Sequence, residues 1–255
     1  MKKTLSVVIP AYNEEENIGP TSLEIISTLR ASSIPFELVI VNDNSKDSTP
    51  EIIKDLQKSN PEIKLVNRKP PGGFGRAIRS GLEEATGDYI TIVMADLSDD
   101  PKDVVKYYQK LEEGYDCVFG SRFIKGSRVE DYPKVKLFVN RIVNRMLQLL
   151  FWTECNDLTN AFKAFRKHVI KSILPLKASH FNITIEMSLS ALIRDYKIAV
   201  IPIAWYGRKW GSSNLRLRQM GRRYLATLLM VFFQRWLIKD DLMAENTKVD
   251  EMERY

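Results

Sequence analysis

The first half of the chain alternates between short apolar runs and longer amphipathic stretches. Apolar runs rich in β-branched residues cover residues 5–10, 36–41, 63–67 and 89–93. Helical patterns lie between and after them, at residues 15–32, 49–59 and 75–85. Strands that alternate with helices at this spacing predict right-handed βαβ units, and therefore an α/β fold with a mostly parallel sheet flanked by helices.

Acidic and amide side chains follow three of these predicted strands. They are Asn13 and Glu14 after the first strand, residues 43–47 after the second, and residues 96–100 after the fourth. Ligands of open parallel sheets bind beyond the carboxyl ends of the strands. We therefore expect the functional residues of the first half in these three loops.

The second half is mainly helical in pattern. Residues 135–152 form an apolar helical pattern whose polar positions recur at i, i+4 spacing, at Lys136, Asn140, Asn144 and Gln148. Residues 224–233 are apolar except for Thr227. This run is too short to span a bilayer and is typical of a core or interfacial helix. Residues 202–239 contain eight basic residues and no acidic one.

The composition narrows the classes of partner. The chain of 255 residues is 44% hydrophobic, which is ordinary for a folded protein with one sizeable core. Its formal charge of +6 favours an anionic partner, and a nucleotide diphosphate, a lipid phosphate or a phospholipid surface serves as well as a nucleic acid. Two cysteines without CxxC spacing and the absence of a usable signal peptide predict a reduced, cytoplasmic protein.

Seven segments together carry a specific resemblance. VVIPAYNEEENI (7–18), VNDNSKDST (41–49), GGFGRAIRSGLEEATGDYI (72–90) and MADLSDDP (94–101) have the order and spacing of the family 2 glycosyltransferases. GSRF (120–123), DLTNAFKAFR (157–166) and IPIAWYGRKWGSSNL (201–215) resemble the dolichol-phosphate mannose synthase group of polyprenol-phosphate hexose synthases. The resemblance implies a GT-A type catalytic domain over residues 1–215. From the pattern of the remaining residues, we expect a basic amphipathic, interfacial helical segment over 216–239. An acidic polar tail, expected to be loosely ordered, follows over 240–255.

The resemblance implies a nucleotide slot at the first two strand ends. Asp43 and Asp47 would hold the base and ribose of the donor, since carboxylates accept hydrogen bonds from ring N–H groups and sugar hydroxyls. The opposite wall would consist of Pro10, Ala11, Tyr12 and Glu14. The competing interpretation of residues 43–47 is a solvated turn.

The same resemblance implies Mg²⁺ or Mn²⁺ at Asp96, with Ser98 as a second ligand. A hard cation would bridge the donor diphosphate and neutralise charge on the leaving group. The chain departs from the Asp-x-Asp pattern of the family, because Met94 stands where the first Asp is expected. Asp99 and Asp100 precede Pro101, and an ordinary helix N-cap is an equal explanation for them.

Basic residues form the second implied cluster. Arg122, Lys136 and Asn140 would bind the phosphate of a lipid acceptor, while Arg208 and Ser213 would close over the donor. Arg and Lys clamps bring two anionic substrates together, and Asp96, Arg122 and Arg208 are the expected catalytic residues. The competing interpretation for each basic residue is a solvated surface charge.

These observations predict a hexosyltransferase that moves a hexose from a GDP- or UDP-sugar to a polyprenyl phosphate, with inversion at the anomeric carbon. The expected partners are these two substrates and an anionic membrane surface on the cytoplasmic face, where the protein would bind peripherally; a nucleic acid is not expected. One alternative is an enzyme of the same fold with a soluble or glycan acceptor. The other is a catalytically inactive nucleotide-sugar-binding protein. Two departures from the family pattern favour it, Met94 and Asn214, where the resembled group often has Lys.

Overall fold

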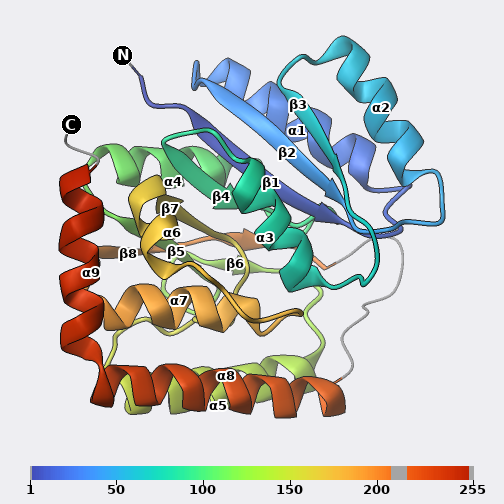
Figure 1. The fold of residues 1–255 in the computed structure, drawn as a ribbon. Helices are drawn as coiled ribbons and strands as arrows, with labels where there is room; N and C mark the ends of the chain where they lie inside the picture. Colours follow the sequence, from blue (N-terminus) through green and yellow to red (C-terminus); the bar gives the residue numbers. More distant parts are fainter. Residues whose placement is uncertain (1, 208–216, 253–255) are drawn as a thin grey trace.

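A seven-stranded sheet forms the centre of the molecule (Figure 1). The structure is a computed structural model and describes residues 2–207 and 217–252. The strands lie in the order β3-β2-β1-β4-β7-β5-β8. Their bounds are β1 Leu5–Ala11, β2 Phe36–Asn42, β3 Ile63–Asn67, β4 Tyr89–Ile92, β5 Cys117–Ser121, β7 Lys163–Arg166 and β8 Ile198–Pro202. β7 is antiparallel to both its neighbours, and the other pairings are parallel, which confirms the predicted mostly parallel sheet.

Three helices cover one face of the sheet. They are α1 (Ile18–Ala31), α2 (Thr49–Ser59) and α4 (Pro101–Glu112). Buried Ile18, Ile25 and Leu29 recur at helical spacing on α1, so one stripe of this helix packs into the core. A small ribbon of β6 (Arg128–Val129) and β9 (Ala204–Trp205) lies beyond the sheet.

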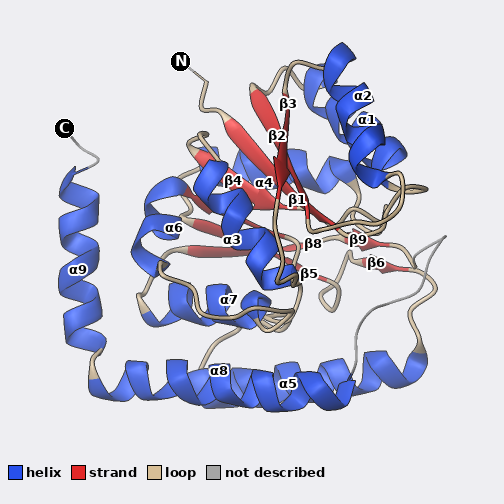
Figure 2. Ribbon diagram, turned by 45° about the vertical axis from the view of Figure 1, so that its right-hand side comes forward, coloured by secondary structure: helices blue, strands red, loops and turns tan. Residues whose placement is uncertain are grey.

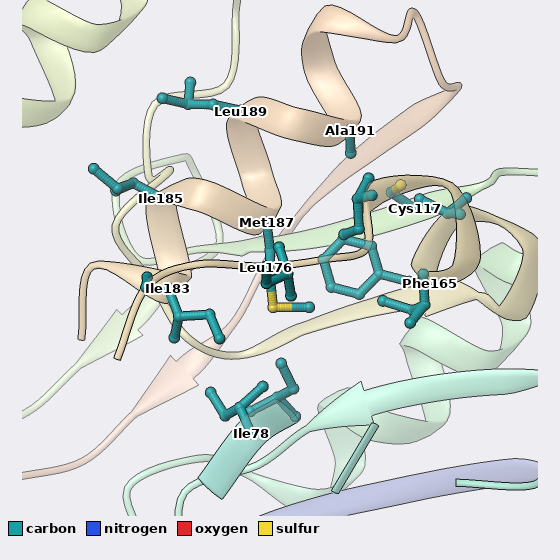
Figure 3. Packing of buried hydrophobic residues seen from close by; sticks show 14 of the residues in the cluster. Ile78, Cys117, Phe165, Leu176, Ile183, Ile185, Met187, Leu189 and Ala191 are labelled. Atoms are coloured by element: carbon teal, nitrogen blue, oxygen red, sulfur yellow. The ribbon is translucent and has the colours of Figure 1, made fainter. Parts of the chain in front are cut away.

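The other face carries two layers of helix (Figure 2). α3 (Phe74–Glu84), α6 (Lys167–Ile173) and α7 (Ile183–Ile193) contribute buried residues to the core on this face, and α5 (Lys134–Phe151) and α8 (Leu217–Leu237) lie outside α7. α7 is apolar around most of its circumference because it is enclosed between the sheet and this outer layer. Figure 3 shows Ile183, Met187 and Ala191 of α7 in this core, near Ile78 and Phe165.

The predicted elements of the first half are confirmed, and only the start of α1 differs from its predicted position by more than one residue. α1 begins at Ile18 rather than at residue 15, because the preceding residues contact the loop after β2. The sequence interpretation did not identify β5, β7 or β8. Of the tail expected to be loosely ordered, residues 240–255, residues 240–252 are helical. They form α9 with Lys239 (Lys239–Met252), with Leu242 buried and Lys239 paired with Asp195.

Two glycines in helices provide a test of this packing. A Cβ at Gly81 of α3 would lie 2.4 Å from Val8 Cγ1, whereas a Cβ at Gly221 of α8 would meet no atom within 4 Å. We expect Gly81→Ala to lower the free energy of unfolding by about 1–3 kcal/mol through overpacking. Gly221→Ala should instead raise it by about 0.5–1 kcal/mol, because alanine is the better helix former. Urea denaturation of both variants measures this, and an unchanged Gly81→Ala would contradict the close packing of α3 on β1.

Candidate active site

The loops after β2, β1 and β4 lie side by side at the carboxyl edge of the sheet. Ala11 pairs with Asn42, and the Asp43 N–H donates to the Ala11 carbonyl at 2.8 Å. On the other side of β1, the Val93 N–H donates to the Val8 carbonyl at 3.1 Å. The three loops expected to carry function are therefore brought together at the switch point between β1 and β4, where ligands of such sheets bind.

Direct hydrogen bonds join the loops after β1 and β2. The Glu14 N–H donates to Thr49 Oγ1 at 2.8 Å, and the Glu15 N–H donates to Asp47 Oδ2 at 3.2 Å. A cavity of about 380 Å³ lies against these loops, lined by Asn13, Glu14, Glu15, Glu16, Asn17, Lys46 and Asp47. Glu14 and Asp47, both predicted for the donor slot, therefore border a cavity.

The remaining predicted donor residues differ in exposure. Pro10 and Ala11 are buried within β1, whereas Tyr12 is exposed. The buried Asp43 carboxylate accepts a hydrogen bond from the Gly73 N–H at 2.6 Å and pairs with Arg68. Asp43 thus ties the end of β2 to the loop before α3, and its contact with a nucleotide stays a prediction.

The glycines around Phe74 allow a close approach of two loops. A Cβ at Gly73 would lie 2.4 Å from the Ser179 carbonyl oxygen, and one at Gly75 would lie 2.5 Å from that of Ala178. Phe74 stacks on Phe181, with ring centroids 4.3 Å apart. Close packing against residues 178–181 therefore explains this glycine-rich segment without a phosphate-binding role.

Asp96 lies in the loop after β4, and hydrogen bonds within this loop hold Asp96 and its neighbours in place. The Ser98 N–H donates to Asp96 Oδ1 at 3.2 Å, and the Met94 N–H donates to Asp99 Oδ2 at 3.0 Å. Asp100 caps α4 by accepting from the Lys102 N–H at 2.9 Å, so the N-cap interpretation holds for Asp100.

This loop provides only part of the set of ligands that a divalent cation needs. Asp96 offers the hard oxygen ligand that Mg²⁺ and Mn²⁺ prefer, but Ser98 is buried. In the described part of the chain, no group of three or more His, Cys, Asp and Glu side chains is placed to hold a metal ion. A cation at Asp96 would therefore need diphosphate oxygens and water as its other ligands.

Asp99 is the buried carboxyl beside Asp96. Burial raises the pKa of Asp99 to about 7; the Met94 N–H and Arg122 oppose this shift, and Asp96 adds to it. Asp99 therefore lies within electrostatic reach of both the predicted metal ligand and the predicted acceptor residue. Its main chain also pairs with Trp205 of β9.

Arg122 forms a buried ion pair with Asp157. Arg122 Nε donates to Asp157 Oδ2 and Nη2 donates to Oδ1, both at 2.7 Å, with the two side chains 8% and 1% exposed. Burial alone lowers the pKa of Arg122, but the charge and hydrogen bonds of Asp157 outweigh it, so the net shift is upward. The interpretation of Arg122 as a solvated surface charge is therefore wrong. The sequence interpretation gave Asp157 no role, although it lies in a segment that carried the resemblance.

Lys136 and Asn140 converge with Arg122 on one side chain, Tyr132. The Lys136 ammonium lies 5.9 Å from the centre of the Tyr132 ring, and Asn140 Nδ2 donates to the Tyr132 hydroxyl at 2.9 Å. Arg122 Nη1 donates to the same hydroxyl at 3.5 Å. The structure thus brings the three predicted acceptor residues together. We define Arg122, Tyr132, Lys136, Asn140 and Asp157 as the basic cluster.

A buried lysine supports the turn that carries Asp157. Lys163 Nζ donates to the carbonyls of Leu158 and Asn160, and Asn160 Nδ2 donates to the Gly120 carbonyl at 2.9 Å. Burial lowers the pKa of Lys163 to about 7, although Asp157 opposes the shift. A neutral amine has two N–H groups, which these two carbonyls accept.

Arg208 and Ser213, expected to close over the donor, lie outside the described residues. The described chain reaches Gly207, whose N–H donates to the Glu130 carbonyl at 3.0 Å. A Cβ at Gly207 would lie 2.6 Å from Asp131 Cβ, so glycine allows the close approach here. Gly207 therefore lies against Glu130 and Asp131, the two residues that precede Tyr132.

A family model described as glycosyl transferase family 2 matches residues 6–174. This match covers more than half of the chain, and the chain therefore belongs to glycosyl transferase family 2. The predicted family is confirmed. The matched range includes Asp96, Arg122, Lys136 and Asn140, whereas α7, α8 and α9 lie beyond it.

Two curated relatives extend the comparison. The chain is 29% identical over 214 residues to the dolichol-phosphate mannosyltransferase of Pyrococcus furiosus, covering 83% of the chain and 59% of that protein. It is 29% identical over 206 residues to glycosyltransferase AglD of Haloferax volcanii, covering 79% of the chain and 33% of that protein. The chain thus spans less than two thirds of the length of either relative.

Solved structures of glucosyl-3-phosphoglycerate synthase from Mycobacterium tuberculosis share the fold. A complex with Mn²⁺, UDP and phosphoglyceric acid has a TM-score of 0.67 at 21% identity, covering 90% of this chain and 78% of that one. A complex with Mg²⁺ and UDP has a TM-score of 0.66 at 22% identity, covering 90% and 79%. These matches confirm the predicted GT-A type fold.

The depressed pKa of Lys163 predicts a pH-dependent stability. The folded-state pKa of about 7 lies below the ordinary value of 10.5, so the unfolded state binds more protons between these values. The cost of burying this group is complete below pH 7 and disappears as the pH rises to about 10.5. We therefore expect the melting temperature of Lys163→Met, relative to that of wild type, to be highest at pH 6 to 7. That advantage should shrink steadily towards pH 10, and a pH-independent difference would contradict the assignment.

Proposed function

We propose that the protein transfers a hexose from a UDP- or GDP-sugar to a polyprenyl phosphate. Membership of glycosyl transferase family 2 and similarity to a dolichol-phosphate mannosyltransferase support the class of reaction. The observation that carries the proposal is the position of the basic cluster beside the loop of Asp96. Trp205 pairs with Asp99 and packs on Tyr132 at 4.7 Å between ring centroids, so a donor at Asp96 and an acceptor anion at the basic cluster would be neighbours.

The donor nucleotide would lie across the ends of β1 and β2, against Tyr12, Glu14, Asp43 and Asp47. Its diphosphate would then point towards Asp96 at the end of β4. Mg²⁺ or Mn²⁺ held by Asp96 and the diphosphate would neutralise charge on the departing nucleoside diphosphate. Arg208 and Ser213 would cover the donor, as the resemblance implies.

The acceptor phosphate would be the nucleophile. One of its oxygens forms the new bond to the anomeric carbon, while the bond from that carbon to the nucleoside diphosphate breaks and its electron pair leaves with the diphosphate. In-line attack inverts the anomeric configuration. A phosphate oxygen is already anionic near neutral pH and needs little help from a base, so the main task of Arg122 and Lys136 is to offset repulsion between two anions.

The outer helices would bring the protein to the lipid. α5 exposes Val135, Phe138, Val139, Ile142, Met146 and Leu149, and α8 exposes Leu225, Leu229, Phe233, Trp236 and Leu237. We call these residues the apolar surface. Its members recur every three or four positions, so each helix presents an apolar stripe outwards. No helix in the described ranges is long and apolar enough to cross a membrane.

Lys136 and Asn140 lie in the first two turns of α5, beside Val135, Phe138 and Val139 of the apolar surface. A lipid whose phosphate binds at the basic cluster could therefore lay its chain along α5. Contact of this kind with an anionic membrane would be peripheral, and we place it at the cytoplasmic face. The sequence interpretation attributed membrane contact to residues 202–239 and did not include the exposed stripe of α5.

Transfer assays test the proposed function directly. The protein is incubated with Mn²⁺, a panel of UDP- and GDP-hexoses labelled in the sugar, and either a polyprenyl phosphate or the matching polyprenyl alcohol. We expect label to enter the organic phase only with the phosphate. Asp96→Asn should lower the rate at least about 100-fold, or about 2.7 kcal/mol of barrier. Asp100→Asn is the matched control and should retain activity, because asparagine caps α4 as well as aspartate does.

Two outcomes would contradict this proposal. Transfer to a soluble acceptor but not to polyprenyl phosphate would support the alternative enzyme of the same fold. Binding of UDP or GDP without transfer from any donor would support an inactive nucleotide-sugar-binding protein.

Liposome flotation tests the apolar surface. Wild type should float with anionic liposomes at low salt and less at high salt, because basic residues near the surface are screened. Phe138→Glu combined with Leu149→Glu should reduce the bound fraction at least about tenfold, since each side chain loses roughly 1.5–3 kcal/mol of burial. Leu23→Glu is the control, because Leu23 is also an exposed apolar residue but lies on α1, which covers the opposite face of the sheet. Absence of wild-type flotation at every salt concentration would reject the membrane contact.

A further inference from the structure

Tyr132 occupies the centre of the basic cluster. It lies between β6 and the start of α5 and is half-buried. Its ring centre is 5.5 Å from the Arg122 guanidinium carbon and 5.9 Å from the Lys136 ammonium. Trp205 packs against the same ring with an interplanar angle of 52°. The ring therefore lies within cation–π range of both cations.

The Tyr132 hydroxyl acts as an acceptor in both of its hydrogen bonds within the described part of the chain. It accepts from Asn140 Nδ2 at 2.9 Å and from Arg122 Nη1 at 3.5 Å. Asn140 is itself held by Thr159, whose hydroxyl donates to Asn140 Oδ1 at 2.6 Å. A phenolic oxygen that accepts in this way keeps its own proton for donation to a further acceptor.

Part of the Arg122 guanidinium is already engaged by Asp157. Asp157 accepts from its Nε and Nη2, which together form one of the edges with which a guanidinium can bind a phosphate bidentately. The remaining nitrogen, Nη1, reaches the Tyr132 hydroxyl. Arg122 therefore contacts both Asp157 and Tyr132 within the cluster.

We propose that Tyr132 is an acceptor-binding residue, whose hydroxyl donates a hydrogen bond to a phosphate oxygen of the acceptor while its ring holds Arg122 and Lys136 in place. This inference rests on the proposed function and adds a residue that the family resemblance did not supply. The ligand chemistry is a phosphate monoester, and the two tyrosine roles, hydroxyl donor and ring support, can be separated by substitution.

Tyr132→Phe keeps the ring and removes the hydroxyl, so the variant should fold normally. Tyr115→Phe is the matched control, because Tyr115 precedes β5, whereas Arg122 follows it at the other end of the strand. We expect Tyr132→Phe to raise the KM for a short-chain polyprenyl phosphate about tenfold or more, as expected when one hydrogen bond to a charged group is lost. The kcat and the KM for the donor should stay within about twofold, and Tyr115→Phe should match wild type throughout.

A binding measurement makes the result independent of turnover. Fluorescence of the tryptophans, of which Trp205 packs on Tyr132, is titrated with the short-chain polyprenyl phosphate and with the matching alcohol. Wild type should prefer the phosphate, and Tyr132→Phe should lose about tenfold of that preference. If wild type makes product and Tyr132→Phe has an unchanged acceptor KM and preference, this inference is wrong and the proposed function stands. If wild type makes no product but shows the phosphate preference and Tyr132→Phe loses it, the inference stands and the proposed function fails. If wild type makes no product and has no preference, both fail.

Discussion

The antiparallel direction of β7 is the constraint on which the candidate active site depends. The other strands of the seven-stranded sheet run the same way, so the loops that follow them meet at one edge. Because β7 enters the sheet from that edge, the turn before it, residues 157–160, lies there as well. In a fully parallel sheet this turn would lie at the opposite edge. Asp157 could not then reach Arg122 at the end of β5.

The ion pair that results changes what Arg122 can contribute. A buried pair of opposite charges is costly to desolvate, and removal of one partner leaves the other unpaired in a medium of low polarity. Arg122 is therefore held rigidly, and its charge is largely balanced by Asp157. Lys136 adds a second cation to the cluster, and Asn140 and Tyr132 help to hold its geometry. The ion pair of Arg122 with Asp157 holds the cluster in a fixed geometry, but it also lowers the net positive charge of the cluster.

The outer helices α5 and α8 cover α7 on one side and expose apolar residues on the other. α5 and α8 cover α7, and this allows α7 to be apolar on nearly every side. The same two helices carry a second set of apolar residues that faces outwards. A soluble protein rarely keeps so long an exposed stripe without a partner for it. In our proposal, the layer that completes the core also holds the protein at the lipid, beside the basic cluster.

The sequence by itself determined the family, the strands and helices of the first half, and the three loops that carry Glu14, Asp43 and Asp96. These features depend on local periodicity and on the rule that ligands bind at the carboxyl ends of parallel strands. Only the tertiary structure decided the pairing of Arg122 with Asp157, the position of Tyr132 and the exposed stripe of α5. Arg122 and Asp157 lie 35 residues apart in sequence, so strand order and direction had to bring them together. An apolar helix also gives no sign, in its own sequence, of which side a neighbouring helix will cover.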